Sequence, residues 1–363
     1  MPSSDSDKVT APSPSRAVGE KIPPPVAPQS LSAPPLTEPA PSALAAGAES
    51  PPTPSPAPDD STPSAEPAAA PEPLPPPLTA PVTAMDYAVW QVRMERENFS
   101  CGTIDGNFGM RSKRSIVQYQ KARGLPVTGT LDLETRLALG APERPFMLYT
   151  VSAADLAQIA PPPTAWRDKA KAGFLGYKNG WEMLAGKFHS SAAFIRQLNP
   201  GLASLSAGVI VTVPNLEPSV PVTRASKITI ILSETTMLLY DRHGRLQACF
   251  PCSIAADKNK RPNGQLTVVT GALNPNYTFN PEVLKTAAER EGITSKLMIP
   301  PGPNNPVGLA WVSLSLPGYG IHGTPDPMEI SRSGSHGCFR LANWNAIKVL
   351  NAVTRGTPVE VIE

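Results

Sequence analysis

The sequence predicts a multidomain α+β protein, in which a small three-helix domain and a βααβ module precede a β-rich C-terminal domain. Three observations indicate this architecture. Prolines crowd the first 84 residues, helix-like and strand-like periods alternate after them, and apolar β-branched runs dominate after residue 225. We therefore expect several modules behind an unfolded segment, and not one globule of 363 residues.

Residues 1–84 are predicted to be a disordered Pro/Ala-rich linker. They hold 24 of the 46 prolines, contain no Phe, Tyr, Trp or Cys, and carry a net charge of −6. Such a segment buries too little apolar surface to offset its chain entropy. The other residues carry a net charge of +8, which is too diffuse to indicate nucleic acid as a partner.

Residues 85–141 are predicted to form the three-helix domain. Helical stretches alternate with an Asp-Gly turn at Asp105-Gly106 and a Thr-Gly turn at Thr128-Gly129, and Ser112 is placed to cap the second helix. The strings IDGNFG, YQKARGL and TGTLDLET in this segment resemble the peptidoglycan-binding domain type 1 family. Asp105 is expected to shape its turn and not to contact a ligand.

Residues 147–216 are predicted to be a second module. A β-branched run at 149–151 and a strand-like run at 207–215 flank two helix-like stretches, which begin near Trp181 and Ala193. This strand, helix, helix, strand order is similar to a degenerate LysM glycan-binding module, with residues 157–180 intruding before the first clear helix.

Residues 225–363 are predicted to form the β-rich domain, which carries the chemistry. Cys338 follows Ser335-His336-Gly337, and His322 lies 16 residues before it. An imidazole can lower the pKa of a thiol and hold its proton, while backbone N–H groups beside the nucleophile can form an oxyanion hole. On residue types alone, zinc ligation by the two histidines and the cysteine, or a merely buried cysteine, stays open.

The pattern HGT, then SRSGSHGCFRL, resembles the signature of the L,D-transpeptidase catalytic domain (YkuD-type). Three segments upstream of it, NPNYTFNP, PPGPNNPVG and GYGIH, resemble the same family. The resemblance implies Cys338 as nucleophile and His322 as proton donor and acceptor, oriented by a carbonyl near Gly323. It also implies backbone N–H groups of Gly337 and Cys338 as the oxyanion hole, with His336 in support.

The resemblance further implies substrate contacts for Arg340, Ser335 and Gly323, although Arg340 and Ser335 serve equally well as braces of the loop. It implies neither a metal nor an organic cofactor. The expected partners are peptidoglycan stem peptides and glycan strands. The expected enzyme is a cysteine acyltransferase that forms 3→3 crosslinks through a thioester on Cys338.

Alternatives remain at this point. The same acyl-enzyme could be resolved by water, as an L,D-carboxypeptidase, or by a protein amine, and a non-catalytic wall-binding protein is a third hypothesis. The implied location is the periplasm or cell envelope. No apolar run long enough to span a membrane and no signal-peptide pattern are present, so we expect an export signal or lipid anchor upstream of Met1.

The remaining cysteines and histidines are expected to be structural. Cys249 and Cys252 form a CxxC pair interrupted by Pro251, which favours structural cysteines over a redox motif. His243 is expected in a turn, and His189 at the surface or in packing.

Overall fold

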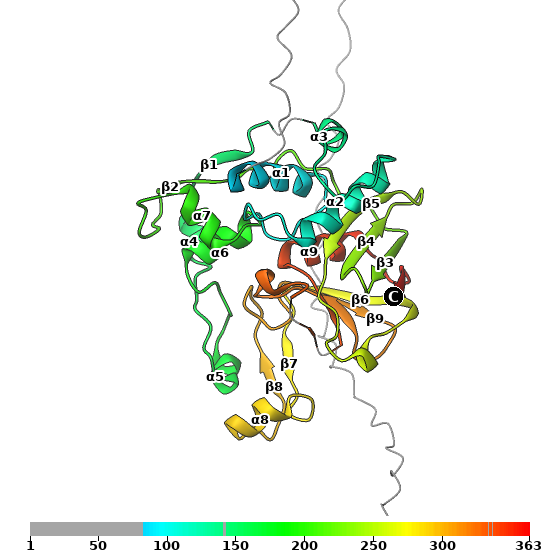
Figure 1. Cartoon of the computed structure of the whole chain (residues 1–363). Helices are drawn as coiled ribbons and strands as arrows, with labels where there is room; N and C mark the ends of the chain where they lie inside the picture. The colour runs from blue at the N-terminus through cyan, green and yellow to red at the C-terminus, as the bar shows by residue number, and fades with distance from the viewer. Residues whose placement is uncertain (1–82, 141–142, 333, 336) are drawn as a thin grey trace, which may run out of the picture.

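The computed structural model describes residues 83–140, 143–332, 334–335 and 337–363. The predicted linker therefore lies almost wholly outside the described residues, and His336 lies outside them too. The described chain is a mixed α+β protein, as predicted, with helices gathered in its N-terminal half and a large curved sheet in its C-terminal half (Figure 1). Within the described residues, no helix is both long and apolar enough to cross a membrane.

Three helices form the first domain: α1 (Ala84–Arg96), α2 (Met110–Arg123) and α3 (Leu133–Leu139). Thr83 begins α1 with a capping box that it shares with Asp86, and Asp132 caps α3. The predicted cap of α2 at Ser112 is wrong. The helix begins at Met110, because the Gly109 carbonyl already accepts the Lys113 N–H at 3.0 Å.

The Asp-Gly turn of this domain is held by side-chain hydrogen bonds. Asp105 Oδ1 accepts from Asn107 N at 2.9 Å and from Gln91 Nε2 at 3.0 Å. Gly106 has a φ of +73°, and a Cβ there would lie 2.4 Å from the carbonyl oxygen of Ala84. Asp105 thus acts as a turn residue, and only glycine fits beside it.

The second module pairs β1 (Phe146–Thr150) antiparallel with β2 (Ile210–Pro214), and its main helices are α6 (Gly180–Lys187) and α7 (Ala192–Leu198). The predicted strand, helix, helix, strand order is therefore present. Two short helices that were not predicted, α4 (Ala153–Leu156) and α5 (Trp166–Lys171), lie between β1 and α6. The similarity of this module to LysM stays a prediction.

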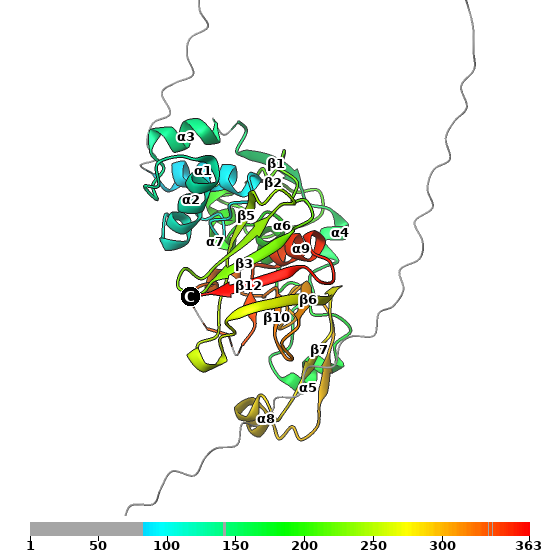
Figure 2. The same cartoon turned by 90° about the vertical axis from the view of Figure 1, so that its right-hand side faces the viewer.

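The C-terminal domain is built on an eight-stranded sheet in the order β11-β10-β9-β6-β12-β3-β4-β5 (Figures 1 and 2). Its strands are β3 (Lys227–Ile231), β4 (Thr236–Tyr240), β5 (Leu246–Pro251), β6 (Gly264–Leu273), β9 (Ala310–Leu314), β10 (Gly320–His322), β11 (Phe339–Arg340) and β12 (Pro358–Ile362). Helix α9 (Asn343–Ala352) packs against β6, β9 and β10 and covers the main apolar core.

An arm projects from this sheet between β6 and β9. It consists of the antiparallel pair β7 (Tyr277–Phe279) and β8 (Leu297–Ile299), with helix α8 (Lys285–Glu291) between them. In both views the arm lies beside α5 of the second module (Figures 1 and 2). Segments more than 100 residues apart in the chain therefore meet there.

The three-helix domain is docked on the edge strand β5. Ser100 N donates to Cys249 O at 2.9 Å, and Cys249 N donates to Asn98 O at 2.9 Å, so residues 98–100 extend the sheet. Below this contact, Leu238 and Cys249 share one apolar core with residues of all three helices. The edge of the sheet is thus covered by another domain and not left open to solvent.

Candidate active site

The sheet brings the predicted nucleophile next to the strand that carries the predicted base. β10 and β11 are parallel neighbours, with Ile321 opposite Phe339 and His322 opposite Arg340. Ile321 and Phe339 both point into the main core. Because side chains alternate along a strand, Arg340 faces the same side as His322, and Cys338 lies in the bend immediately before β11. Pairing of these two short strands therefore brings together the ends of the HGT and SHGC strings.

His322 is held in one orientation by its neighbours. Its Nδ1 lies 2.7 Å from the carbonyl oxygen of Gly323, so Nδ1 carries the proton and Nε2 is left as a base. Trp311 stacks beside the imidazole, with 5.6 Å between ring centroids. Burial lowers the pKa of His322 to about 4, and the charge of Arg340 acts in the same direction. The imidazole is therefore neutral at physiological pH.

Cys338 is a neutral thiol in this structure. Its Sγ lies 3.6 Å from the carbonyl oxygen of Gly318, to which it donates a hydrogen bond. Burial raises the pKa of the Cys338 thiol to about 11, against the opposing effects of the Gly320 backbone N–H and the Arg340 charge. The resting pair is thus thiol and imidazole, and the thiolate has to form as the thiol attacks.

Ser335 holds the loop immediately before the nucleophile. Its Oγ donates to the carbonyl oxygen of Cys338 at 2.5 Å and accepts from Gly337 N at 3.2 Å. Its backbone bonds to Ile254 and Ala256 on the neighbouring segment. The Gly337 N–H, predicted as an oxyanion donor, is engaged inside this loop in the resting structure.

Arg340 and Gly323 contribute to the frame of the site. Arg340 Nη2 donates to Gly334 O at 2.6 Å, and the Arg340 backbone exchanges two hydrogen bonds with Ser253. A Cβ on Gly323 would lie 2.2 Å from Asn343 Oδ1, so this position is packed too tightly for a side chain. Gly323 therefore offers its carbonyl to His322, while Arg340 braces the loop and places a positive charge near Cys338.

Sequence reasoning assigned no role to three aromatic residues of the site. Trp311 stacks on His322, the Tyr319 ring packs beside Gly337, and Tyr277 interacts electrostatically with Cys338. Burial, with a further contribution from Cys338, raises the pKa of Tyr277 to about 12. Tyr277 and Tyr319 lie within the strings NPNYTFNP and GYGIH, which resemble the family. The resemblance of these strings pointed to the segments but assigned no role to either tyrosine.

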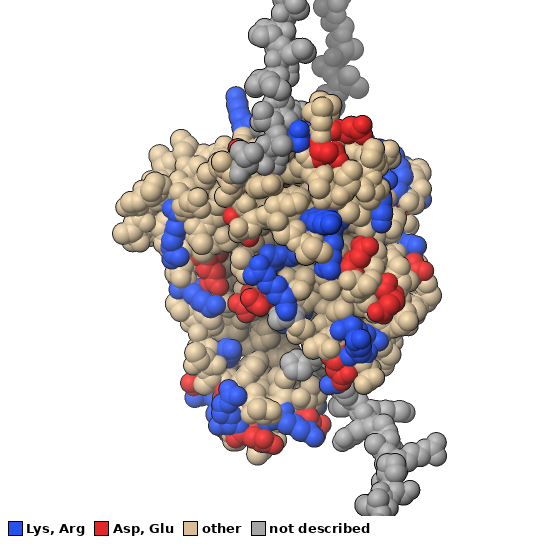
Figure 3. All heavy atoms as spheres, viewed as in Figure 1, with Lys and Arg blue, Asp and Glu red and all other residues tan. Residues whose placement is uncertain are grey.

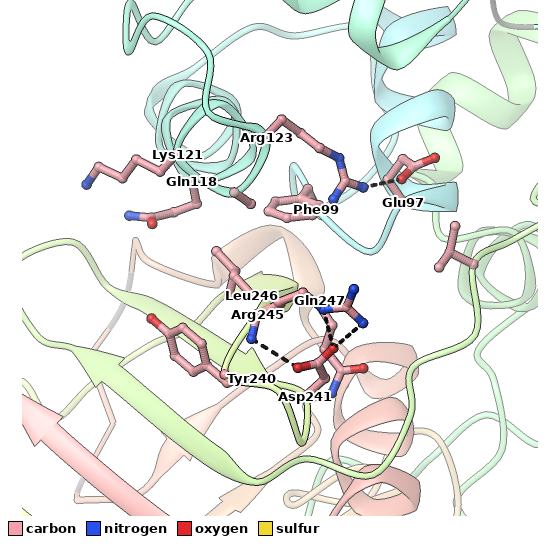
Figure 4. Close-up of a pocket in the computed structure, with 13 residues that line it drawn as sticks. Glu97, Phe99, Gln118, Lys121, Arg123, Tyr240, Asp241, Arg245, Leu246 and Gln247 are labelled. Carbon is pink, nitrogen blue, oxygen red and sulfur yellow. Dashed lines mark hydrogen bonds and ion pairs between the residues drawn. The ribbon is translucent and has the colours of Figure 1, made fainter.

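Two clefts lie outside this constellation. One, of about 610 Å³, separates α2 from the β4–β5 hairpin (Figure 4). Four of its charged side chains are paired with one another, Arg123 with Glu97 and Arg245 with Asp241, each pair at 2.8 Å. No predicted catalytic residue lines it. The other, of about 340 Å³, lies between α6 and the catalytic domain and adjoins the loop after His322 through Thr324.

The other three cysteines are buried free thiols. Burial raises the pKa of Cys101 and of Cys252 to about 12, and that of Cys249 well above its usual value. These properties support structural roles for the CxxC pair. Over the described part of the chain, no three His, Cys, Asp or Glu side chains gather as a metal site, and the zinc alternative also required His336.

The two remaining histidines lie where structural residues are expected. His243 lies in an exposed turn, whereas His189 is partly buried and stacks against Trp344, with 4.8 Å between ring centroids. On the face shown in Figure 3, positive and negative side chains are interspersed, with no broad patch of one sign. That face offers no electrostatic footprint for nucleic acid.

Comparison with known proteins identifies two of the domains. Residues 225–361 match the family model of the L,D-transpeptidase catalytic domain, and residues 90–139 match the model described as "Putative peptidoglycan binding domain". The chain is 28% identical over 182 residues to "Putative L,D-transpeptidase YkuD" of Bacillus licheniformis, covering 50% of this chain and 92% of that protein. It is 26% identical over 185 residues to "Probable L,D-transpeptidase ErfK/SrfK" of Escherichia coli, covering 50% and 59%.

Among solved structures, the chain aligns with an L,D-transpeptidase from Mycobacterium smegmatis at a TM-score of 0.31 and 19% identity, covering 44% of this chain and 65% of that one. A TM-score this low supports no conclusion, so the assignment rests on the sequence matches. Residues 225–361 of this chain form a member of the L,D-transpeptidase catalytic domain family, and residues 90–139 form a domain of the peptidoglycan-binding family.

Proposed function

We propose that this protein is a peptidoglycan L,D-transpeptidase that works through a thioester on Cys338 and acts outside the cytoplasm. The observation that supports the proposal is the β10–β11 pairing, because Cys338 directly precedes β11 and the neighbouring strand carries a neutral His322 whose Nδ1 proton is held by Gly323. A thiol near an unprotonated Nε2 can pass its proton as it attacks. Relatives carrying the same domain are named as L,D-transpeptidases.

In the first half-reaction, the Cys338 sulfur attacks the carbonyl of the third residue of a donor tetrapeptide, and its proton passes to His322 Nε2. Backbone N–H groups at Gly337 and Cys338 would hold the developing oxyanion, which requires Gly337 N to leave Ser335 Oγ. The C–N bond to the terminal D-residue then breaks, and that amine leaves with the proton from His322. A thioester remains on Cys338.

In the second half-reaction, an amine of another stem peptide attacks the thioester carbonyl and gives up its proton to His322. The C–S bond breaks, and the sulfur of Cys338 regains a proton from the imidazolium. The product is a 3→3 crosslink. Water or a protein amine in place of the acceptor would yield hydrolysis or protein attachment from the same thioester, and Arg340 and Ser335 would stabilise the loop in either case.

The test is to incubate the full chain with purified disaccharide tetrapeptides and to identify the products by mass. We expect a crosslinked dimer that lacks one terminal D-residue. Cys338→Ala should reduce turnover by at least about 10³-fold, as expected for loss of a covalent nucleophile. Cys252→Ala, which removes a buried thiol that takes no part in the proposed chemistry, should retain activity.

Other products would correct the proposal in defined ways. Tripeptide without dimer would replace transfer by hydrolysis. Full activity of Cys338→Ala would remove the nucleophile. An unchanged tetrapeptide, together with no carbapenem adduct on Cys338 by mass, would leave a non-catalytic wall-binding protein as the better description.

A further inference from the structure

The second module sends a segment away from its own core and onto the catalytic domain. We call residues 157–179, which run from the end of α4 to the start of α6 and carry α5, the strap. Figures 1 and 2 show α5 beside the β7–β8 arm in both views, at the far end of the module from β1 and β2. The strongest contacts of α5 are with β8.

The strap and the arm share one small apolar core. The Trp166 ring lies 4.7 Å from the Phe279 ring and 6.1 Å from that of Tyr277, between centroids. Leu175 is fully buried in the same cluster, with Phe279 and Ile299 of the arm. A two-stranded hairpin is marginally stable by itself, so the apolar contacts with the strap stabilise the arm.

Polar contacts fasten the strap to the arm at the start of α5 and again at Leu175. The Glu291 carboxylate at the end of α8 accepts from Trp166 N at 2.9 Å, and Arg167 Nη2 donates to Gly292 O at 2.7 Å. On the return path, Leu175 N donates to Pro301 O at 2.9 Å, and Asn304 N donates to Leu175 O at 3.0 Å. The strap is therefore tied before α8 ends and again just after β8.

The arm that the strap holds borders the candidate active site. Tyr277, the first residue of β7, packs near Trp166, and Cys338 adds to the effect of burial that raises the pKa of Tyr277. The chain that returns from the arm packs on the residue after His322, because a Cβ on Gly308 would lie 2.6 Å from the carbonyl carbon of Gly323. Lys169 of α5 interacts electrostatically with Glu291 on the arm and with Asp326 in the loop between His322 and Cys338. The strap thus faces both the arm and the catalytic loop.

We propose that the strap is a positioning element for the donor peptide, and that Trp166 is its key residue. By fixing the β7–β8 arm, Trp166 holds Tyr277, and the chain that returns from the arm past Gly323, in the positions that receive the donor peptide. This proposal rests on the proposed function above. It gives the second module a task in catalysis that is separate from any binding of glycan.

The test compares Trp166→Ala and Trp166→Phe with the wild-type full chain, using two measurements. The first is steady-state kinetics with tetrapeptide donor. The second is the rate at which iodoacetamide alkylates Cys338, which needs no substrate. Glu289→Ala, an exposed change on α8, is the matched control.

We expect Trp166→Ala to raise the donor KM by roughly tenfold to hundredfold with a smaller change in kcat. The reason is that the arm is misplaced while Cys338 and His322 keep their positions. Alkylation of Cys338 should become several-fold faster as the arm loosens. Trp166→Phe should restore both values, since a smaller aromatic ring still packs on Phe279. Glu289→Ala should behave as wild type.

A lower melting temperature with unchanged KM and unchanged alkylation rate would overturn the proposal, as would failure of Trp166→Phe to rescue. If Trp166→Ala does not fold, Glu291→Gln weakens the contact between Glu291 and Trp166 N without opening a cavity. We expect the same rise in donor KM and the same faster alkylation from this variant. A wild-type protein without donor turnover would defeat the proposed function, and the alkylation rates would still report whether the strap controls access to Cys338.

Discussion

At the scale of single residues, the site is notable for its uncharged resting state. Burial lowers the pKa of His322 to about 4 and raises that of Cys338 to about 11, so both groups are neutral between these limits. Arg340 favours the thiolate and disfavours the imidazolium, but burial dominates in each case. Cys338 is therefore a protonated thiol over this range, and the proposed mechanism requires the thiolate to form as the sulfur attacks.

This state predicts the pH dependence of alkylation at Cys338. With a raised thiol pKa, the thiolate fraction, and thus the iodoacetamide rate, should rise about tenfold per pH unit from pH 6 to 9. His322 should add no step in that range, since it is already neutral. The measurement is mass-resolved alkylation over this range, with Cys338→Ala as the blank. A rate that levels off below pH 8 would instead indicate a resting thiolate–imidazolium pair.

Sequence reasoning at this scale could name Cys338 and His322, because their spacing in one segment carries the family pattern. It could not assign roles to Trp311 or Tyr277. Trp311 reaches His322 only because β9 pairs antiparallel with β10, and Tyr277 reaches Trp166 only because the arm packs against α5. Neither pairing can be derived from local periodicity.

At the scale of elements, one buried carboxylate joins all three modules. Glu95 of α1 accepts from Lys348 of α9 at 2.9 Å, and His189, which follows α6, bonds to it at 2.9 Å. Burial by itself would raise the pKa of Glu95, but Lys348 and His189 outweigh burial and lower it to about 2. Burial also lowers the pKa of His189, so a neutral imidazole donates to a charged carboxylate.

Removing this carboxylate should destabilise the junction. Glu95→Ala leaves Lys348 and His189 without their partner, and we expect a loss of about 3–5 kcal/mol at pH 7. Glu95→Gln, which keeps an acceptor oxygen, should cost less. Because the folded pKa is depressed, the contribution is present above pH 4.5 and is lost as the pH falls toward 2.

Urea unfolding of the two Glu95 variants at pH 7 checks this prediction. Glu134→Ala, which removes an exposed carboxylate from the first turn of α3, is the control and should stay within about 0.5 kcal/mol of wild type. Equal free energies of unfolding for Glu95→Ala and Glu134→Ala would show that the buried network contributes nothing.

At the scale of the whole molecule, the peptidoglycan-binding domain is part of the catalytic body. It supplies the segment that pairs with the sheet edge at β5 and most of the apolar core beneath it. Arg111 of α2 also donates to the carbonyl oxygens of Met328 and Ile330, each at 3.4 Å, in the loop between His322 and Cys338. The two domains are thus joined by direct packing close to the candidate active site.

A chain shortened to begin at residue 222 should therefore aggregate or be less stable than the longer chain. Without the helical domain, β5 becomes an open edge, and Leu238 and Cys249 become exposed apolar surface. We expect aggregation in size-exclusion chromatography, or a melting temperature at least about 5 °C below that of a chain beginning at residue 83. A monomeric short chain with an unchanged melting temperature would show that the docking is dispensable.

The sequence by itself determined the class of the protein. The proline distribution, the turn strings and the SHGC signature predicted a mixed α+β chain with a helical wall-binding domain and a cysteine-dependent catalytic domain. These features are local, because the residues that define a turn, a cap or a nucleophile loop lie within about 20 positions of one another in the sequence. The misplacement of the α2 cap at Ser112 is the usual error at element ends.

Only the tertiary structure decided how the modules serve one another. The sequence suggested modules arranged in series, whereas packing unites them through β5, Glu95 and the strap. The strap was visible in the sequence only as an intrusion at 157–180, because its partners at Phe279 and Glu291 lie more than 100 residues away. Contacts of that range depend on which surfaces are left to bury, and no periodicity within a segment encodes them.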